Sequence, residues 1–113
     1  MVGSAVLLSA LFSLVEAADI AVLPDPARSA EVLFLGENHD NPVHHAVQAA
    51  WVAALRPKAI VFEMLTEEQV ARITPALRRD KAALAAALRW EEAGWPDFDM
   101  YFPIFAAAPD ARI

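Results

Sequence analysis

The sequence predicts an α/β fold, in which a parallel βαβ-based sheet is flanked by helices and belongs to a larger α/β domain. Two short apolar runs, Glu31–Leu35 and Ala59–Phe62, are typical of buried strands, and a segment long enough for a helix separates them. A strand–helix–strand connection gives parallel strands with a right-handed crossover. Strands that are apolar throughout suit a sheet covered on both faces.

Composition excludes several classes of protein. The chain has 113 residues, of which 58% are hydrophobic, so it is long enough for one small domain and too apolar to be disordered. Its formal net charge is −6 and no basic cluster occurs, which argues against nucleic acid as a partner. Without cysteine the chain has no disulfide, thiolate ligand or acylated lipoprotein anchor, so we do not expect membrane association through such an anchor.

Three regions follow from the sequence pattern. Residues 1–17 contain an apolar run of about the length found in signal peptides, although no Lys or Arg precedes it. We expect a cleaved export signal; a buried N-terminal helix is the alternative. Residues 18–30 form an irregular lead-in, because Pro24 and Pro26 interrupt them. Residues 31–113 form the domain itself.

The first helix is predicted from Pro42 to about Leu55. Asn41 is a suitable N-cap and proline is favoured at the first helical position, while Pro57 ends the segment. The apolar stripe expected on this helix comprises Val43, Val47, Ala50 and Ala54.

Two further helices and a loop complete the expected order. Thr66 with Gln69 makes a capping box for a helix from Glu67 to about Arg78. Asp80 caps an alanine-rich helix that runs to about Trp90. Residues 95–105 are rich in aromatic residues and proline, and we expect an ordered loop there that leads into a short helix.

Titratable side chains follow both predicted strands. All three histidines of the chain lie within residues 36–45, and a glutamate directly follows the second strand. Parallel strands present their carboxyl ends at one edge of a sheet, where ligands of α/β folds bind. The groups expected there are Glu37, His39, Asp40, His44, His45 and Glu63.

These side chains predict a divalent metal site or an acid–base site. Glu37, His39 and Glu63 are suitable metal ligands, and two close carboxylates can share a proton. Each residue also has a structural interpretation: favourable charge at a helix start for Glu37, a salt bridge for Glu63 and loop ordering for His39. His44 and His45 point about 100° apart on a helix, so at most one of them faces the site.

An aromatic segment near the C-terminus carries a second signal. Core packing explains these side chains most simply, but they also suit the wall of a flat apolar ligand site. Tyr101 would offer a phenol oxygen, and tyrosinate is an axial ligand of haem iron. The residues concerned are Trp90, Trp95, Phe98, Tyr101, Phe102 and Phe105.

The motifs resemble the ChaN-like haem-binding uptake family, which shares a superfamily with the Tiki proteases, the TraB/PrgY proteins and the erythromycin esterases. The resemblance runs from about Val32 to Ala108. It is carried by separate blocks that occur in order: Leu35–His45 with Gln48, Val61–Met64, Gly94–Pro96 and Tyr101–Ile104.

The resemblance implies an exported bacterial haem-binding protein, periplasmic or membrane-associated, that acts in iron or haem uptake, with homodimers as a possible assembly. Haem is the expected cofactor, with His39, His44, His45 and Tyr101 as candidate ligands. Members are about twice as long as this chain, so we expect it to be an N-terminal portion. We expect a binding protein rather than an enzyme; the alternative is a metal-dependent hydrolase with Glu37, His39 and Glu63 as catalytic residues.

Overall fold

The computed structural model describes residues 22–113, so the expected signal segment 1–17 lies outside the described residues. The chain divides into two compact units, Met1–Leu33 and Phe34–Ile113. The described part of the first unit contains helix α2 (Asp25–Ser29). The prediction of an irregular lead-in is therefore wrong at α2. Pro26 does not prevent the helix, because a residue in the first turn needs no backbone N–H.

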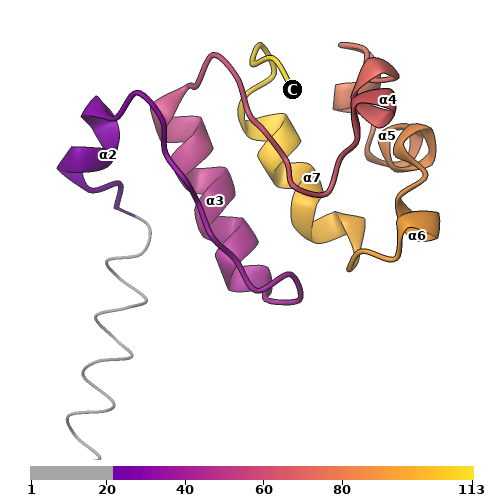
Figure 1. Ribbon diagram of the computed structural model, residues 1–113, viewed down its shortest axis with the longest axis horizontal. Helices are drawn as coiled ribbons and strands as arrows, with labels where there is room; N and C mark the ends of the chain where they lie inside the picture. Colours follow the sequence, from indigo (N-terminus) through magenta and orange to yellow (C-terminus); the bar gives the residue numbers. More distant parts are fainter. Residues whose placement is uncertain (1–21) are drawn as a thin grey trace, which may run out of the picture. The chain divides into compact units, whose positions relative to one another are not determined.

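The second unit is built from helices and the segments that connect them (Figure 1). Its helices are α3 (Pro42–Leu55), α4 (Glu67–Ala71), the 3₁₀ turn η1 (Leu77–Arg79), α5 (Lys81–Leu88), α6 (Trp90–Ala93) and α7 (Phe98–Ala107). Every helix of residues 22–113 is too short or too polar to cross a membrane.

The predicted parallel sheet is not present in residues 22–113. The β pairing found there is one isolated parallel bridge between Ala59 and Arg112. Ile60 N–H donates to the carbonyl of Arg112 (2.7 Å), and Arg112 N–H donates to the carbonyl of Lys58 (2.9 Å). The α/β prediction is therefore wrong for this structure. Apolar, β-branched runs indicate which segments suit a strand, but a strand exists only where a second backbone supplies its hydrogen bonds.

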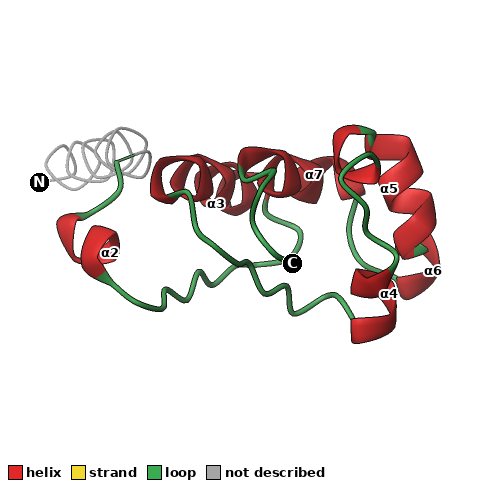
Figure 2. Ribbon diagram, turned by 90° about the horizontal axis from the view of Figure 1, so that it is seen from above, coloured by secondary structure: helices red, strands yellow, loops and turns green. Residues whose placement is uncertain are grey.

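Helices α3 and α7 lie side by side, and the second predicted strand segment, Ala59–Phe62, runs along this pair (Figures 1 and 2). Side chains of the second segment alternate between the helices and solvent. Phe62 and Met64 are buried, whereas Val61 is 94% exposed. Phe62 stacks on Phe105 of α7, with ring centroids 4.3 Å apart and planes 7° apart. In the first segment, Phe34 is 91% exposed.

The start and end of α3 are as predicted, but its buried face is not. The side chain of Asn41 accepts a hydrogen bond from Val43 N–H, and Pro42 occupies the first turn. Val43, expected in the apolar stripe, is 56% exposed. The buried residues are instead His45, Gln48 and Val52. A polar face of α3 thus packs inward, and this arrangement requires hydrogen-bond partners within the unit.

The next two predicted helices begin correctly and end early. The capping box of Thr66 and Gln69 is present, yet α4 ends at Ala71 and only the short turn η1 follows. Pro75 explains the break, because it disfavours the helical conformation at the preceding residue and donates no hydrogen bond. Asp80 caps α5 as predicted; Arg89, with φ of 53°, ends the helix before α6 begins.

Helix α7 occupies most of the segment that was expected to be a loop. Its N-cap is Asp97, whose side chain accepts from Asp99 N–H. Pro103 lies inside the helix. The prediction of a loop that leads into a helix is therefore right in its order, but the helix begins earlier than expected, at Phe98.

A buried arginine holds the C-terminal end of α7. The guanidinium of Arg78 donates to the carbonyls of Ala108 and Ala111, and it lies 3.4 Å from the carbonyl of Phe105. These contacts satisfy carbonyl groups that a helix end leaves unpaired. They also place Arg112 beside the second extended segment, where the parallel bridge forms.

Candidate functional site

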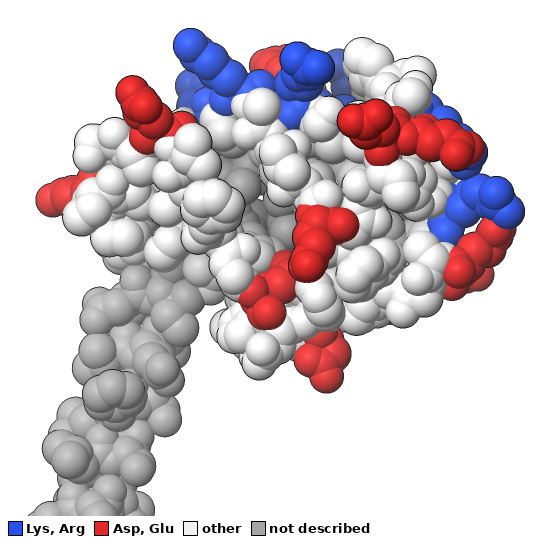
Figure 3. All heavy atoms as spheres, in the orientation of Figure 1, with Lys and Arg blue, Asp and Glu red and all other residues white. Residues whose placement is uncertain are grey.

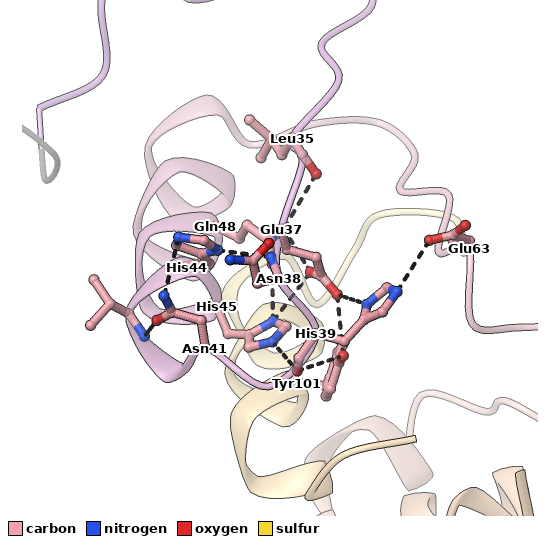
Figure 4. Close-up of polar contacts among 11 residues, drawn as sticks. Leu35, Glu37, Asn38, His39, Asn41, His44, His45, Gln48, Glu63 and Tyr101 are labelled. Atoms are coloured by element: carbon pink, nitrogen blue, oxygen red, sulfur yellow. Dashed lines mark hydrogen bonds and ion pairs between the residues drawn. The ribbon is translucent and has the colours of Figure 1, made fainter. Parts of the chain in front are cut away.

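The candidate site lies where the first extended segment turns into α3 (Figure 4). Asn41 N–H donates to the carbonyl of Asn38 (2.9 Å), which closes a tight turn. His44 Nδ1 accepts from Asn38 N–H (2.9 Å), and Asn41 caps the helix. These local bonds fix the direction of Glu37 before the turn and of His45 after it.

Glu37 is the centre of the site. Its side chain is only 10% exposed. One carboxylate oxygen, Oε1, accepts from Nδ1–H of His39 (2.7 Å) and lies 3.1 Å from the hydroxyl of Tyr101. The other, Oε2, accepts from Nε2–H of Gln48 (2.8 Å) and lies 3.3 Å from Nδ1 of His45. One buried carboxylate therefore binds four side chains, from α3, α7 and the connecting turn.

The ionised form of Glu37 is favoured by these contacts. Burial raises the pKa of the carboxyl group, but hydrogen bonds from His39, Gln48 and Tyr101 and the electrostatic effect of His45 outweigh burial. The pKa consequently lies below the ordinary value of 4.5. At neutral pH the centre of the site carries a negative charge.

Tyr101 is fully buried and its phenol group is held neutral. Its hydroxyl is the donor to two acceptors, Oε1 of Glu37 at 3.1 Å and the carbonyl of His39 at 3.2 Å. Burial raises the pKa of the phenol well above its usual value of 10, and the Glu37 carboxylate raises it further. Tyr101 therefore acts as a hydrogen-bond donor in this arrangement.

His45 is also occupied within the site. It is 1% exposed. Nε2–H donates to the carbonyl of His39 (3.0 Å), and Nδ1 lies 3.3 Å from both Glu37 Oε2 and Gln48 Oε1. Gln48 in turn donates to the carbonyl of Leu35 (3.3 Å). His45 thus joins α3 to Glu37 and His39 of the preceding turn, and Gln48 joins α3 to the first extended segment.

His39 and Glu63 form the outer part of the site. The side chain of His39 is 39% exposed and that of Glu63 is 78% exposed. Nε2 of His39 lies 3.8 Å from Oε2 of Glu63, which is beyond hydrogen-bond distance. The indole ring of Trp95 meets His39 edge-on, with centroids 4.9 Å apart at 70°. His39 therefore presents one nitrogen that has no hydrogen bond among the described residues.

The structure brings together most of the predicted residues, despite the absence of the sheet. Contacts of 3.8 Å or less join His39 to both Glu37 and Glu63, and join His45 to Glu37. His44 instead orders the turn, since its Nε2 lies 3.3 Å from Nδ2 of Asn41. Asp40 acts on the site through its charge, which helps to raise the pKa of Tyr101. No group of three or more His, Asp or Glu side chains in residues 22–113 is arranged to hold a metal ion.

Sequence reasoning missed the partners that come from distant parts of the chain. Gln48 lies 11 residues from Glu37, and Tyr101 lies 64 residues away. Tyr101 is the single tyrosine of the sequence and sits in a strongly apolar segment. A buried tyrosine hydroxyl needs an acceptor, so this residue carried a signal that pointed to a buried carboxylate.

The aromatic segment is mainly core. Trp90, Phe98, Tyr101 and Phe105 are buried, and Trp90 Nε1–H donates to the carbonyl of Pro96 (2.7 Å). Trp95 and Phe102 are partly exposed. Of this set, Trp95 is the residue that combines partial exposure with contact to His39.

Comparison with known proteins identifies one family. The sequence model of the family described as "Haem-binding uptake, Tiki superfamily, ChaN" matches residues 23–113. No curated protein and no solved structure matches the chain significantly.

Proposed function

The chain belongs to the haem-binding uptake family of the Tiki superfamily (ChaN), and from this premise we propose that it binds haem as an exported bacterial protein of iron or haem uptake. The proposal rests on Nε2 of His39, a ring nitrogen of a partly exposed side chain at the edge of the Glu37 site, which has no hydrogen bond among residues 22–113. An imidazole nitrogen is one of the common axial ligands of haem iron.

The residues around the site suit a flat apolar ligand. Phe34 and Val61 are almost fully exposed in the segments that lead to Glu37 and Glu63. Figure 3 shows carboxylates on an otherwise largely uncharged central area of this face, with Lys and Arg side chains along its top and right edges. Trp95 adds an aromatic edge beside His39. A donor atom together with uncovered apolar side chains is what a porphyrin ring requires. Haem, when bound, supplies an iron centre and a large apolar plane.

A metal-dependent hydrolase receives no support from the geometry. The three residues expected to ligate the metal do not surround a common point; His39 lies between the two glutamates and contacts each through a different ring nitrogen. Glu37 is moreover already saturated by hydrogen bonds from protein side chains.

Titration of the full chain with haemin tests the proposal. We expect a Soret band that shifts and saturates at one haemin per binding site at micromolar protein. A folded protein that produces no such shift would contradict haem binding. Export is tested separately, by determining the N-terminus of the protein secreted by a bacterial host; we expect it to begin near residue 18, and an intact N-terminus would contradict cleavage.

A further inference from the structure

We propose that a hollow between α5, α6 and the start of α7 binds a small organic cation that carries an apolar or aromatic group. The hollow has a volume of about 320 Å³ and is lined by side chains of all three helices and of the segment that joins α6 to α7. This volume is at the lower end of the range found for small-molecule sites. The inference does not depend on haem binding, because none of the candidate haem ligands lines this hollow.

Two tryptophan rings give the hollow its apolar surface. Trp90 is 2% exposed, and its indole N–H donates to the carbonyl of Pro96 (2.7 Å). Phe98 also packs against the Trp90 ring, with centroids 5.0 Å apart. Trp95 is partly exposed and lines the hollow from the segment before α7. The rings are therefore held by the protein before any ligand arrives.

Small side chains on α5 leave the space that these rings border. Ala82 and Ala85 line the hollow, and residues three apart lie on one face of a helix. The large side chains of the same helix, Leu84 and Leu88, are fully buried in the core. The sequence of α5 thus separates a face that packs inward from a face of methyl groups beside the indole rings.

The exposed side chains of the hollow are mainly acidic. Glu91, Asp97 and Asp99 contribute three carboxylates, whereas Lys81 contributes the one ammonium group. Nζ of Lys81 is paired with Oδ1 of Asp99 at 2.7 Å, and this pair joins α5 to α7. Asp97 is close enough for its charge to help raise the pKa of Lys81. Glu91 and Asp97 form no ion pair among residues 22–113, so the lining has an excess of two negative charges.

These surroundings select the charge and the shape of a ligand. An anion would be repelled by the excess of carboxylates. An ammonium or guanidinium group is attracted by the carboxylates and also by the face of an indole ring, which is the best aromatic partner for a cation. An apolar group on the same molecule would remove water from the surface of Trp95. The hollow therefore fits a small amine or guanidine that has a hydrocarbon or aryl group.

NMR titration of the full chain with phenethylamine, a cation at neutral pH, tests the proposal. The chain has three tryptophans, and we expect the indole N–H signals of Trp90 and Trp95 to shift and saturate. The signal of Trp51, which does not line the hollow, should stay in place. Phenethyl alcohol and hydrocinnamate are the neutral and anionic controls, and both should bind more weakly than the amine. No saturable shift, or equal affinity for the three compounds, would overturn the proposal.

Charge-neutralising variants locate the attraction in the hollow. Glu91→Gln and Asp97→Asn each preserve the shape of the side chain, and asparagine remains a good N-cap for α7. We expect each to weaken phenethylamine binding about fivefold. Glu92→Gln is the matched control, because Glu92 pairs with Arg89 and does not line the hollow; its affinity should equal that of the wild type. Equal losses in Glu91→Gln and Glu92→Gln would show that only the overall charge matters, and would contradict a site in this hollow.

Discussion

The two extended segments have similar sequences but are held in different ways. Each is a short apolar run followed by a glutamate. Glu37 ends the first and is buried among partners from α3 and α7, whereas Glu63 ends the second and is 78% exposed. The second segment is held by Phe62 in the core and by the bridge to Arg112, whose position depends on Arg78.

The difference shows that the same local pattern can place a carboxylate in the core or on the surface. What decides is the presence of donors from elsewhere in the chain. Gln48 and Tyr101 reach Glu37 from two helices, and without such donors a buried carboxylate would be too costly. Glu63 has no equivalent donors among residues 22–113, and its side chain is exposed beside His39.

The largest expected effect on the free energy of unfolding comes from comparing the buried Phe62 of the second segment with the exposed Phe34 of the first. Phe62→Ala removes a ring stacked on Phe105, and we expect it to lower the free energy of unfolding by about 3–5 kcal/mol. Phe34→Ala, at a ring that is 91% exposed, should change it by less than about 0.5 kcal/mol. Urea denaturation measures both. Equal losses in the two variants would show that Phe34 is covered in the protein.

The two glutamates provide the next contrast. Glu37→Ala removes the acceptor of His39 and one of the two acceptors of Gln48 and of Tyr101, and we expect a loss of about 3 kcal/mol in the free energy of unfolding. Glu63→Ala should cost less than about 0.5 kcal/mol. The same urea titration compares them. A larger loss for Glu63→Ala would reverse the roles assigned to the two segments.

Two adjacent arginines, Arg78 and Arg79, test whether Arg78 holds the C-terminal segment that pairs with the second extended segment. Arg78→Met leaves the carbonyls of Ala108 and Ala111 without their donor, and we expect a loss of about 2 kcal/mol. Arg79→Met, at an exposed position of the same turn, is the matched control and should be near neutral. Hydrogen exchange at Ile60 and Arg112 should accelerate only in Arg78→Met; unchanged exchange would separate Arg78 from the bridge.

The smallest effect concerns acid stability. The folded pKa of Glu37 lies below 4.5, so its charge stabilises the folded state above that pH, and the contribution is lost as pH falls through the folded pKa. Unfolding free energy of the wild type should therefore decrease below about pH 4.5. Glu37→Gln should lack this part of the decrease, whereas Glu63→Gln should retain it. Parallel acid titrations of the three proteins would reveal identical curves if the assignment is wrong.

Local signals in the sequence predicted local features well. The N-caps Asn41, Thr66 and Asp80 all begin helices, because a cap depends on hydrogen bonds within a few residues. The meeting of Glu37, His39 and Glu63 was also anticipated, although for a reason that did not hold, since residues 22–113 contain no sheet whose edge could gather them.

Features that depend on distant partners were not predictable in the same way. Strand formation requires a second backbone, and the sequence of Ala59–Phe62 does not specify one. The inward face of α3 is polar because Glu37 and Tyr101 supply its partners, so the apolar stripe at Val43 was misleading. The family match over residues 23–113 confirms the resemblance. The resemblance depends on motif blocks that occur in a fixed order, which hydrophobic periodicity does not detect.

The central claim is that Glu37 holds the hydroxyl of Tyr101 in a hydrogen bond. Nε2 of His39 is then the ring nitrogen that has no hydrogen bond among residues 22–113. Tyr101 is the only tyrosine in the chain, so its ionisation can be followed directly by the ultraviolet absorbance of tyrosinate as pH is raised. Burial and the Glu37 carboxylate raise the pKa of this phenol. The folded protein should show no tyrosinate at pH values around 10, and ionisation should appear only at higher pH or on unfolding. A normal titration centred near pH 10 in folded protein would contradict the account.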